Sequence, residues 1–293
     1  MNHKINRNRN TNYRTIRDNF FYSLFVFCTM IGVIGLAILL IDVFLDGYSW
    51  VNLDFLTNYA SRFPGQSGIL APLMGTLWVV GLTAIMVIPV GLGTAIYLEE
   101  FAADNIFNRL LNLNISNLAG VPSVIYGLLG LAIFVQLMLD GQRAIIAGSL
   151  TMTLLVLPIV IIASQEAIRA VPSGYRDAAF AMGATRWQVV KTVVIPQAMP
   201  SVMSGIILAL SRAVGESAPI LVISALIFLT YIPTSPLDRF TVLPLQIFSW
   251  ASQPQHEFRS IASAGIIVLL IVLLSMNSIA IYIRSKTQSR SEQ

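Results

Sequence analysis

Long apolar runs are the feature of this sequence that most restricts its fold. Six such runs lie near residues 20–45, 71–98, 117–139, 144–165, 201–229 and 260–283. Each exceeds the roughly eighteen apolar residues that indicate a membrane-spanning helix. A transmembrane β-barrel would instead show segments of about ten residues that alternate in hydrophobicity, and this pattern is absent. We therefore expect an all-α membrane protein with six transmembrane helices.

The composition agrees with this class of protein. Hydrophobic residues make up 56% of the chain and charged residues 11%. Globular proteins average about 45–50% apolar and about 25% charged residues. An ordinary soluble domain is therefore excluded.

The distribution of basic residues predicts the orientation in the membrane. With six spans, the N-terminal tail, the loops 99–116 and 166–200 and the C-terminal tail share one side, which holds thirteen of the eighteen Lys and Arg residues. The opposite side holds four, and Arg212 lies inside a run. Because cytoplasmic loops are enriched in Lys and Arg, we expect both termini and the 166–200 loop in the cytoplasm. A basic tail can also bind nucleic acid, but beside a membrane helix it favours the topological role, so we expect no nucleic-acid partner.

The first run is expected to remain in the protein as a helix. It is too long for the h-region of a signal peptide, and the residues around its end, such as Asp42, Phe44 and Asp46, offer no small-residue cleavage site. Cys28, the single cysteine, lies in this run and leaves no intrachain disulfide. The expected organisation is a cytoplasmic tail (1–19), a first helix with an outer loop (20–70), a core (71–284) and a second cytoplasmic tail (285–293).

The connections between runs three and four and after run two give further expectations. The third run opens at Asn117 with Pro122 near its start, where proline costs no helical hydrogen bond. The short turn 140–143 makes the third and fourth helices antiparallel neighbours. The acidic connection Glu99-Glu100-Phe101 is expected to be a solvated loop.

Two charged residues interrupt the fifth run. Arg212 lies about eleven residues after Ser201, which is roughly 16 Å along a helix and close to the middle of a hydrocarbon core about 30 Å thick. Glu216 follows four residues later on the same helix face. A charge at this depth is costly unless it faces protein or water, and by default it indicates a functional site.

Two interpretations of this pair are open. In the structural one, Arg212 and Glu216 neutralise each other and fix the helix. In the functional one, the Arg212 guanidinium binds a tetrahedral oxyanion in transit, while Glu216 holds Arg212 or weakens its grip so that the ion is released. We favour the second.

The polar segment 172–200 predicts two short amphipathic helices. Their apolar stripes comprise Tyr175, Ala178, Ala179 and Met182 in the first, and Trp187, Val190 and Val194 in the second. Gly183 between them suits a left-handed helix end, and Pro196 is expected to end the second helix. Helices this short need a partner surface. The membrane interface, the underside of the protein itself and another protein all remain candidates.

The spacing within this segment resembles the EAA loop of ABC importer permeases. The matching positions are Asp177-Ala178-Ala179, then Gly183, then an aliphatic-x-aliphatic-Pro ending that includes Ile195 and Pro196. Asp177 stands where the family usually has glutamate. In that family the loop seats in a cleft of the ATP-binding subunit. The resemblance therefore implies that these residues dock an ATPase and that this chain is not itself an enzyme.

Other stretches narrow the resemblance to the permeases of phosphate-specific (Pst) importers. The segment Arg212–Pro219 is similar to their signature, and residues 89–100, 117–123 and 243–247 also resemble that family. Together they indicate the A-type permease, with a similarity that covers about 70–284.

This resemblance implies a MetI-like ABC type-1 importer permease core in the bacterial cytoplasmic (inner) membrane, in contact with lipid. It further implies a second homologous permease of the C type, a dimer of ATP-binding subunits, an external phosphate-binding protein and phosphate as the substrate. It implies no cofactor.

Three alternatives stay open at this point. The first is an ABC permease for another oxyanion, such as sulfate or molybdate, or for an organic solute. The second is an ion-coupled secondary transporter or channel, which needs no ATPase. An intramembrane enzyme is disfavoured, because His3 and His256 lie outside the runs, no metal-ligand cluster is evident and Ser211 and Ser217 have no histidine base nearby in sequence.

Overall fold

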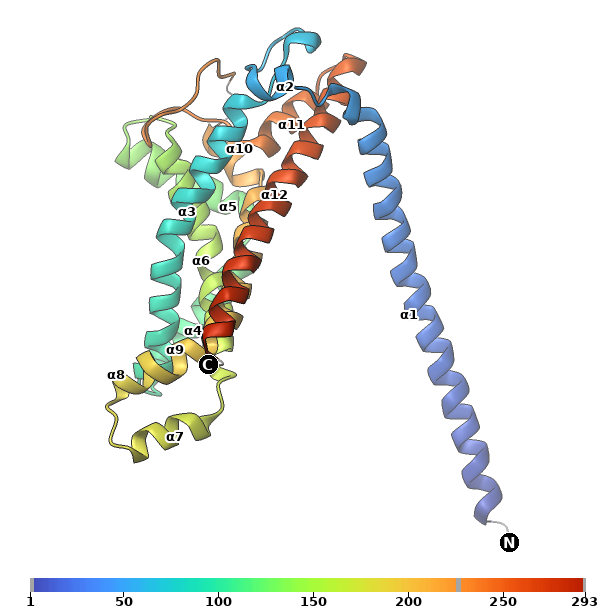
Figure 1. Ribbon diagram of the computed structural model, residues 1–293, viewed down its shortest axis with the longest axis vertical. Helices are drawn as coiled ribbons and strands as arrows, with labels where there is room; N and C mark the ends of the chain where they lie inside the picture. Colours follow the sequence, from blue (N-terminus) through green and yellow to red (C-terminus); the bar gives the residue numbers. More distant parts are fainter. Residues whose placement is uncertain (1–2, 225–227, 292–293) are drawn as a thin grey trace.

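The computed structural model describes residues 3–224 and 228–291, and it is built from helices (Figure 1). The α-helices are α1 (His3–Gly47), α2 (Leu53–Thr57), α3 (Leu70–Ile96), α4 (Ile106–Ala119), α5 (Ser123–Gly130), α6 (Ile145–Arg169), α7 (Ser173–Ala181), α8 (Arg186–Val189), α9 (Ile195–Gly215), α10 (Ala218–Ser224), α11 (Leu243–Ala251) and α12 (His256–Ser291). Short 3-10 turns are η1 (Tyr48–Trp50) and η2 (Pro64–Gln66), and π-helical segments are η3 (Tyr97–Phe101), η4 (Leu131–Met138) and η5 (Val190–Val194). The all-α class is confirmed.

The described residues contain five helices that are long and apolar enough to cross a membrane. They are Arg17–Trp50, Leu70–Phe101, Ile145–Arg169, Arg186–Gly215 and His256–Ser285. A sixth candidate is the pair Ile106–Ala119 and Ser123–Met138, which is bent by 101° at its break. Within the described residues each of the six predicted runs overlaps helix, but two of them have different bounds from those predicted.

The third run is divided by a sharp bend, and most of the segment 99–116 is helical rather than a loop. Helix α4 starts at Ile106 and is capped by the Asn105 side chain, which accepts a hydrogen bond from the Asn108 backbone at 2.9 Å. The chain then turns at Gly120-Val121-Pro122, and the following helix starts at Ser123. Because proline disfavours the helical conformation of the preceding residue, the apolar sequence continues across this point while the helix does not.

The predicted bounds of the fifth run, 201–229, are also wrong. A continuous helix runs from Arg186 through η5 and α9 to Gly215. Pro196 does not end it: this proline directly follows the π-helical segment η5, at the start of α9, and the helix continues past it. At its far end the helix stops at Gly215, and Glu216 is extended with φ −83° and ψ 110°. Residues 225–227 of the predicted run lie outside the described residues.

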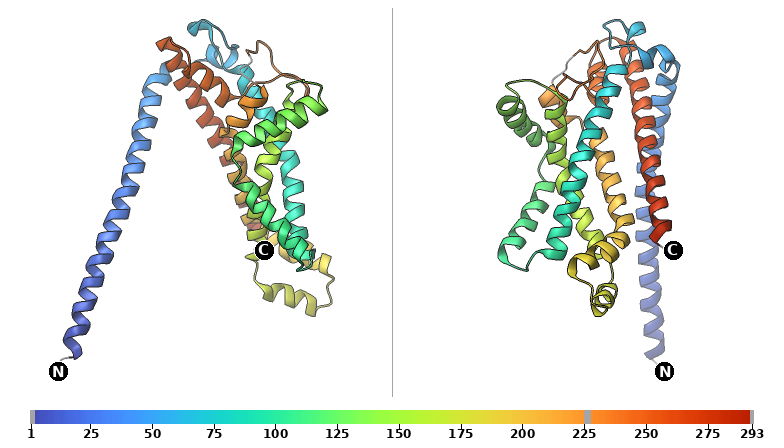
Figure 2. Two further views of the ribbon diagram at one scale, coloured as in Figure 1. Left: turned by 180° about the vertical axis from the view of Figure 1, so that it is seen from behind. Right: turned by 60° about the vertical axis from the view of Figure 1, so that its left-hand side comes forward.

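The core of the bundle is formed where α3 and α9 pack against α6 (Figure 2). Small residues permit this close packing. A Cβ atom on Gly205 would lie 2.5 Å from the Ala163 Cβ, and one on Gly91 would lie 2.7 Å from Val160 Cγ1. Small residues at helix contacts let backbones approach each other within a membrane, so these glycines set the distances of α9 and α3 from α6.

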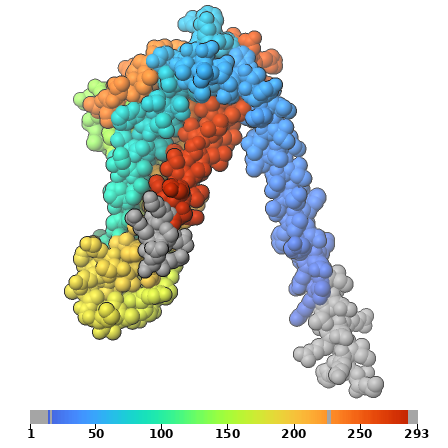
Figure 3. Space-filling view, in the orientation of Figure 1, coloured from blue at the N-terminus to red at the C-terminus, as the bar shows by residue number. Residues whose placement is uncertain are grey.

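Helix α1 stands apart from the bundle over most of its length (Figures 1 and 3). It meets the rest of the chain near Gly47, where a Cβ would clash with Ala264 of α12. None of its apolar window is buried within the chain. The N-terminal end of α1 and the C-terminal end of α12 both point toward the end of the bundle that carries α7 and α8. We call this the loop end, and the end that carries α2 and α11 the opposite end.

Candidate functional site

The segment between α6 and α9 forms two helical pieces at the loop end, as predicted. Helix α7 ends near Gly183, whose φ of +85° is the left-handed conformation that glycine adopts without strain. The next helix is started by a capping box, in which the Thr185 and Gln188 side chains each bond the other's backbone N–H. The predicted glycine joint is therefore confirmed, although the second piece continues into α9.

The residues predicted to dock an ATPase lie on one segment but differ in exposure. Asp177, Ala178, Gly183 and Pro196 are exposed, and Ile195 is half-buried. Ala179 is also half-buried, and its side chain packs against the main hydrophobic core.

Large apolar side chains of the same segment remain uncovered. Met182 is 88% exposed and Trp187 58% exposed, and Tyr175 is exposed beside them in sequence. Val190 and Val194, by contrast, are fully buried. Val190 and Val194 of the second stripe therefore pack on the protein itself, whereas Trp187 and most of the first stripe remain exposed.

The acidic connection after α3 is not a solvated loop, and this prediction was wrong. Residues Tyr97–Phe101 form η3, and the side chains of Glu99 and Glu100 are only 13% and 12% exposed. Glu99 pairs with Arg169 at 2.7 Å and Glu100 with Arg176 at 2.9 Å. Their partners lie about seventy residues away in sequence, so local sequence patterns give no sign of either pair.

The charged pair of the fifth run lies where the helix stops. Arg212 is in the last turn of α9, and Glu216 follows its end, so the depth counted from Ser201 no longer holds and the two do not share a helix face. Their charged groups still approach, with Arg212 Nε 4.0 Å from Glu216 Oε2. The Arg212 side chain is 57% exposed and that of Glu216 is 19% exposed. The guanidinium is thus available to a ligand, and the carboxylate behind it is shielded.

Glu216 is surrounded mainly by apolar side chains of the core. It shares a small cavity with Thr76 and Val79 of α3, Met152 of α6 and Val242 before α11. Thr76 also accepts a hydrogen bond from the Leu243 backbone at 2.8 Å. Helix α3 therefore reaches from the acidic residues at the loop end to the neighbourhood of Glu216.

Two polar contacts join α9 to α12, and the sequence analysis did not single them out. Ser211 donates to the Asn277 side chain at 2.5 Å, and Arg284 donates to Ser204 at 2.7 Å. The two members on each helix are seven residues apart, which places them on one face. An asparagine inside an apolar run is the signal that could have indicated this contact. The Ser211 contact fixes the residue directly before Arg212.

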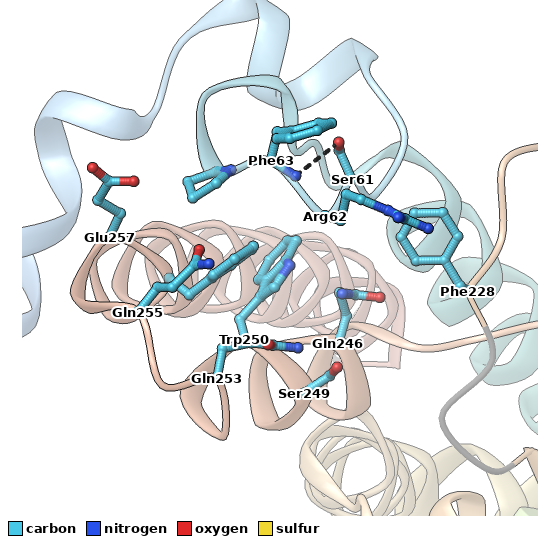
Figure 4. A pocket seen from close by; sticks show the side chains of 12 residues that line it. Ser61, Arg62, Phe63, Phe228, Gln246, Ser249, Trp250, Gln253, Gln255 and Glu257 are labelled. Atoms are coloured by element: carbon cyan, nitrogen blue, oxygen red, sulfur yellow. Dashed lines mark hydrogen bonds between the residues drawn. The ribbon is translucent and has the colours of Figure 1, made fainter.

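A polar cavity of about 700 Å³ opens at the opposite end (Figure 4). Its walls include Gln246, Ser249 and Gln253 from α11 and the segment after it, with Arg62 and Phe228 beside them in Figure 4. Trp250 is 2% exposed and packs against Phe55 of α2, with ring centroids 5.9 Å apart.

Within the described residues, no group of three or more His, Cys, Asp or Glu side chains could hold a metal ion.

Comparison with known protein sequences places this chain in a family. Residues 87–288 match the family described as binding-protein-dependent transport system inner membrane component. The chain is 32% identical over 276 residues to the probable ABC transporter permease protein YqgI of Bacillus subtilis, covering 90% of this chain and 94% of the relative. It is 32% identical to the phosphate transport system permease protein PstA 1 of Mycobacterium tuberculosis (strain CDC 1551 / Oshkosh), covering 92% and 88%.

Solved structures share the fold at lower identity. A bacterial alginate ABC transporter in complex with an alginate-bound periplasmic protein contains a chain that matches 93% of this one, with a TM-score of 0.69 and 16% identity. The inward-facing MetNI methionine ABC transporter contains a chain that matches 75% of this one, with a TM-score of 0.63 and 17% identity. With a fold shared by ABC importers and a family match over most of its length, the chain belongs to the inner membrane components of binding-protein-dependent transport systems, and is a multi-pass ABC permease subunit rather than an enzyme.

Proposed function

We propose that this chain is the permease subunit of an ATP-driven importer of inorganic phosphate and forms half of its translocation pathway. The observation that carries the proposal is its 32% identity, over most of both chains, to a protein named as a phosphate transport permease. Further support comes from 27% identity to the PstA protein of Haemophilus influenzae over 94% of this chain.

Arg212 and Glu216 supply the chemistry that this substrate needs. Phosphate is a tetrahedral oxyanion, and the planar guanidinium of arginine matches its oxygens with two parallel hydrogen bonds. The exposed Arg212 side chain is free to make such contacts, while the shielded Glu216 carboxylate lies 4.0 Å away. A balanced pair binds phosphate weakly enough to release it again, as transport requires.

The segment between α6 and α9, at the loop end of the bundle, is the proposed docking site of the ATP-binding subunit. The residues assigned to it are Asp177, Ala178, Ala179, Gly183, Ile195 and Pro196. Support comes from the apolar side chains of Tyr175, Met182 and Trp187, which are exposed on the same segment. Covering them in a cleft would remove apolar surface from water.

The complete transporter, in this proposal, contains a second homologous permease of the C type and two ATP-binding subunits, and it receives phosphate from an external binding protein. Helix α1 supports a further membrane partner, because its apolar window is uncovered by the chain itself. Lipid covers the apolar surface that the partner subunits leave exposed. The complex lies in the bacterial cytoplasmic membrane with the loop end inside, since most Lys and Arg residues are on that side. The tails 1–19 and 285–293 are then cytoplasmic, and 20–70 and 71–284 form the first helix with its outer loop and the permease core.

Another tetrahedral oxyanion is the second candidate substrate, because a guanidinium also matches sulfate and molybdate. Uptake of labelled phosphate, sulfate and molybdate by cells that lack this chain and all other phosphate carriers separates the two. We expect the chain to restore phosphate uptake alone and to co-purify with an ATP-binding subunit. Phosphate uptake that is the same with and without the chain contradicts the proposal, as does transport without an ATPase partner.

A further inference from the structure

We call residues 166–200 the docking loop. Three consecutive residues that follow α3 each contact a different part of it. Glu99 contacts Arg169 at the end of α6, where the loop begins. Glu100 contacts Arg176 of α7, and Phe101 contacts the start of α8. The π-helical segment η3 carries all three, and such segments occur often at functional sites. The whole docking loop is therefore fastened to one helix.

The first contact is bidentate. Arg169 donates from Nε to Glu99 Oε2 at 2.8 Å and from Nη2 to Glu99 Oε1 at 2.7 Å. Two parallel hydrogen bonds of this kind fix orientation as well as distance. Arg169 is half exposed and also contacts Glu166 at 3.3 Å, so this pair is the more solvated of the two.

The second contact is largely enclosed and involves more groups. Arg176 and Glu100 keep only 20% and 12% of their side-chain surfaces exposed. Besides Glu100, Arg176 donates to the backbone oxygens of Val171 at 2.6 Å and Ile168 at 2.9 Å. One guanidinium thus joins the last turn of α6, helix α7 and the end of α3, and it lies directly before Asp177.

The third contact reaches the other half of the loop. The rings of Phe101 and Trp187 have centroids 6.3 Å apart, and the Arg186 guanidinium lies 5.6 Å from the centre of the Phe101 ring. Both geometries are within the range of attractive aromatic and cation–π contacts. Arg186 and Trp187 start the continuous helix that ends beside Arg212.

We infer that Glu99, Glu100 and Phe101 are positioning residues that transmit movement of the docking loop to α3. The helical span continues from this point, through Pro89, to Thr76 and Val79, which line the small cavity with Glu216. It is fastened at one end to the loop and packed at the other against the Glu216 cavity, so a chain of packed side chains and ion pairs connects the two sites. The inference rests on the proposed function, because it assigns the source of the movement to an ATPase bound at the loop.

The Glu100–Arg176 pair gives the sharpest test. The purified complex is reconstituted in liposomes with its phosphate-loaded binding protein, and ATP hydrolysis and phosphate uptake are measured together. For Glu100→Gln we expect the ATP-binding subunit to remain bound while phosphate moved per ATP falls by about two- to thirtyfold, the range of single-site effects on coupling. Arg176→Gln should lower the same ratio, and the double variant should be no worse than the more affected single variant, because each single variant already removes the Glu100–Arg176 ion pair.

Asp104→Asn is the matched control. It replaces an acid by its amide and removes the ion pair between Asp104 and Arg109, whose side chains are 87% and 67% exposed, respectively. This pair joins α4 only to the residues directly before it. This variant should keep the ratio of the unchanged complex. An unchanged ratio in Glu100→Gln, or additive losses in the double variant, overturns the inference. If Glu100→Gln fails to assemble, Glu99→Gln at the more exposed pair provides the same ratio. Absence of phosphate uptake by the unchanged complex contradicts the proposed function instead. In that case the variants are still compared by their rates of ATP hydrolysis in the presence of the loaded binding protein.

Discussion

At the scale of single residues, Arg212 is the side chain whose loss should affect transport most. Its side chain is 57% exposed, and its Nε lies 4.0 Å from the Glu216 carboxylate, so Arg212→Ala removes an anion ligand without opening the core. We expect phosphate uptake to fall to background while the complex assembles in normal amount. Arg259→Ala, at an exposed arginine near the start of α12, should keep full uptake. Normal uptake by Arg212→Ala would leave this residue with only a structural role.

Gly183 is the second residue with a specific physical requirement. Its φ of +85° is strained for any side chain with a Cβ, and most strained for a β-branched one. We expect Gly183→Val to disturb the joint between α7 and α8 at a cost of about 1–2 kcal/mol, and so to reduce binding of the ATP-binding subunit in a pull-down from membranes. Gly174→Val in α7 is the control, because this glycine also has open space around it but no positive φ. Equal binding by both variants would show that the glycine conformation does not matter for docking.

At the scale of elements, the packing of α9 on α6 depends on a close approach at one glycine. A side chain at Gly205 would collide with Ala163, and overpacking of this kind costs about 1–3 kcal/mol. Gly205→Leu should therefore lower the thermal unfolding midpoint of the purified protein. Gly81→Leu in α3, where a Cβ meets nothing within 4 Å, should leave it nearly unchanged. A smaller effect at Gly205 than at Gly81 would contradict the packing described for α9.

The helices were predictable from sequence where apolar runs coincide with them, and not where they depend on backbone breaks or distant partners. The first, second, fourth and sixth runs lie on α1, α3, α6 and α12. Hydropathy does not register the turn at Gly120–Pro122, because the apolar residues continue across it. It also places the start of the fifth helix too late, because Arg186–Pro200 is amphipathic and buries Val190 and Val194 against the core. The sequence predicts a helix stop at Pro196, yet the helix continues through this proline.

In the candidate site, too, features with a local sequence signal were predictable and contacts between distant residues were not. The glycine joint was predictable because a left-handed helix end has a local sequence signature at Gly183. The contacts of Glu99 and Glu100 were not, since their partners become neighbours only when α3 packs beside α6. Ser211 and Asn277 are likewise joined only by the packing of α9 against α12.

At the scale of the whole molecule, the chain has the form of one part of a larger assembly. The α1 arm buries none of its apolar window (Figure 3), and the docking loop leaves Met182 and Trp187 uncovered at the other side of the bundle. A soluble protein would not tolerate apolar surfaces of this size. In the membrane, lipid and partner subunits cover them in our proposal, and the charged contacts at the loop end join the docking loop to the end of α3.

The central claim is that this chain moves phosphate using ATP hydrolysed by a bound partner. The most direct measurement is uptake of labelled phosphate by liposomes that contain the purified complex with its phosphate-loaded binding protein, with ATP either enclosed or omitted. We expect phosphate to accumulate only with ATP, sulfate and molybdate not to be taken up, and the Arg212→Ala complex still to hydrolyse ATP but to move no phosphate. Accumulation of phosphate without ATP, or transport of sulfate or molybdate in place of phosphate, would contradict it.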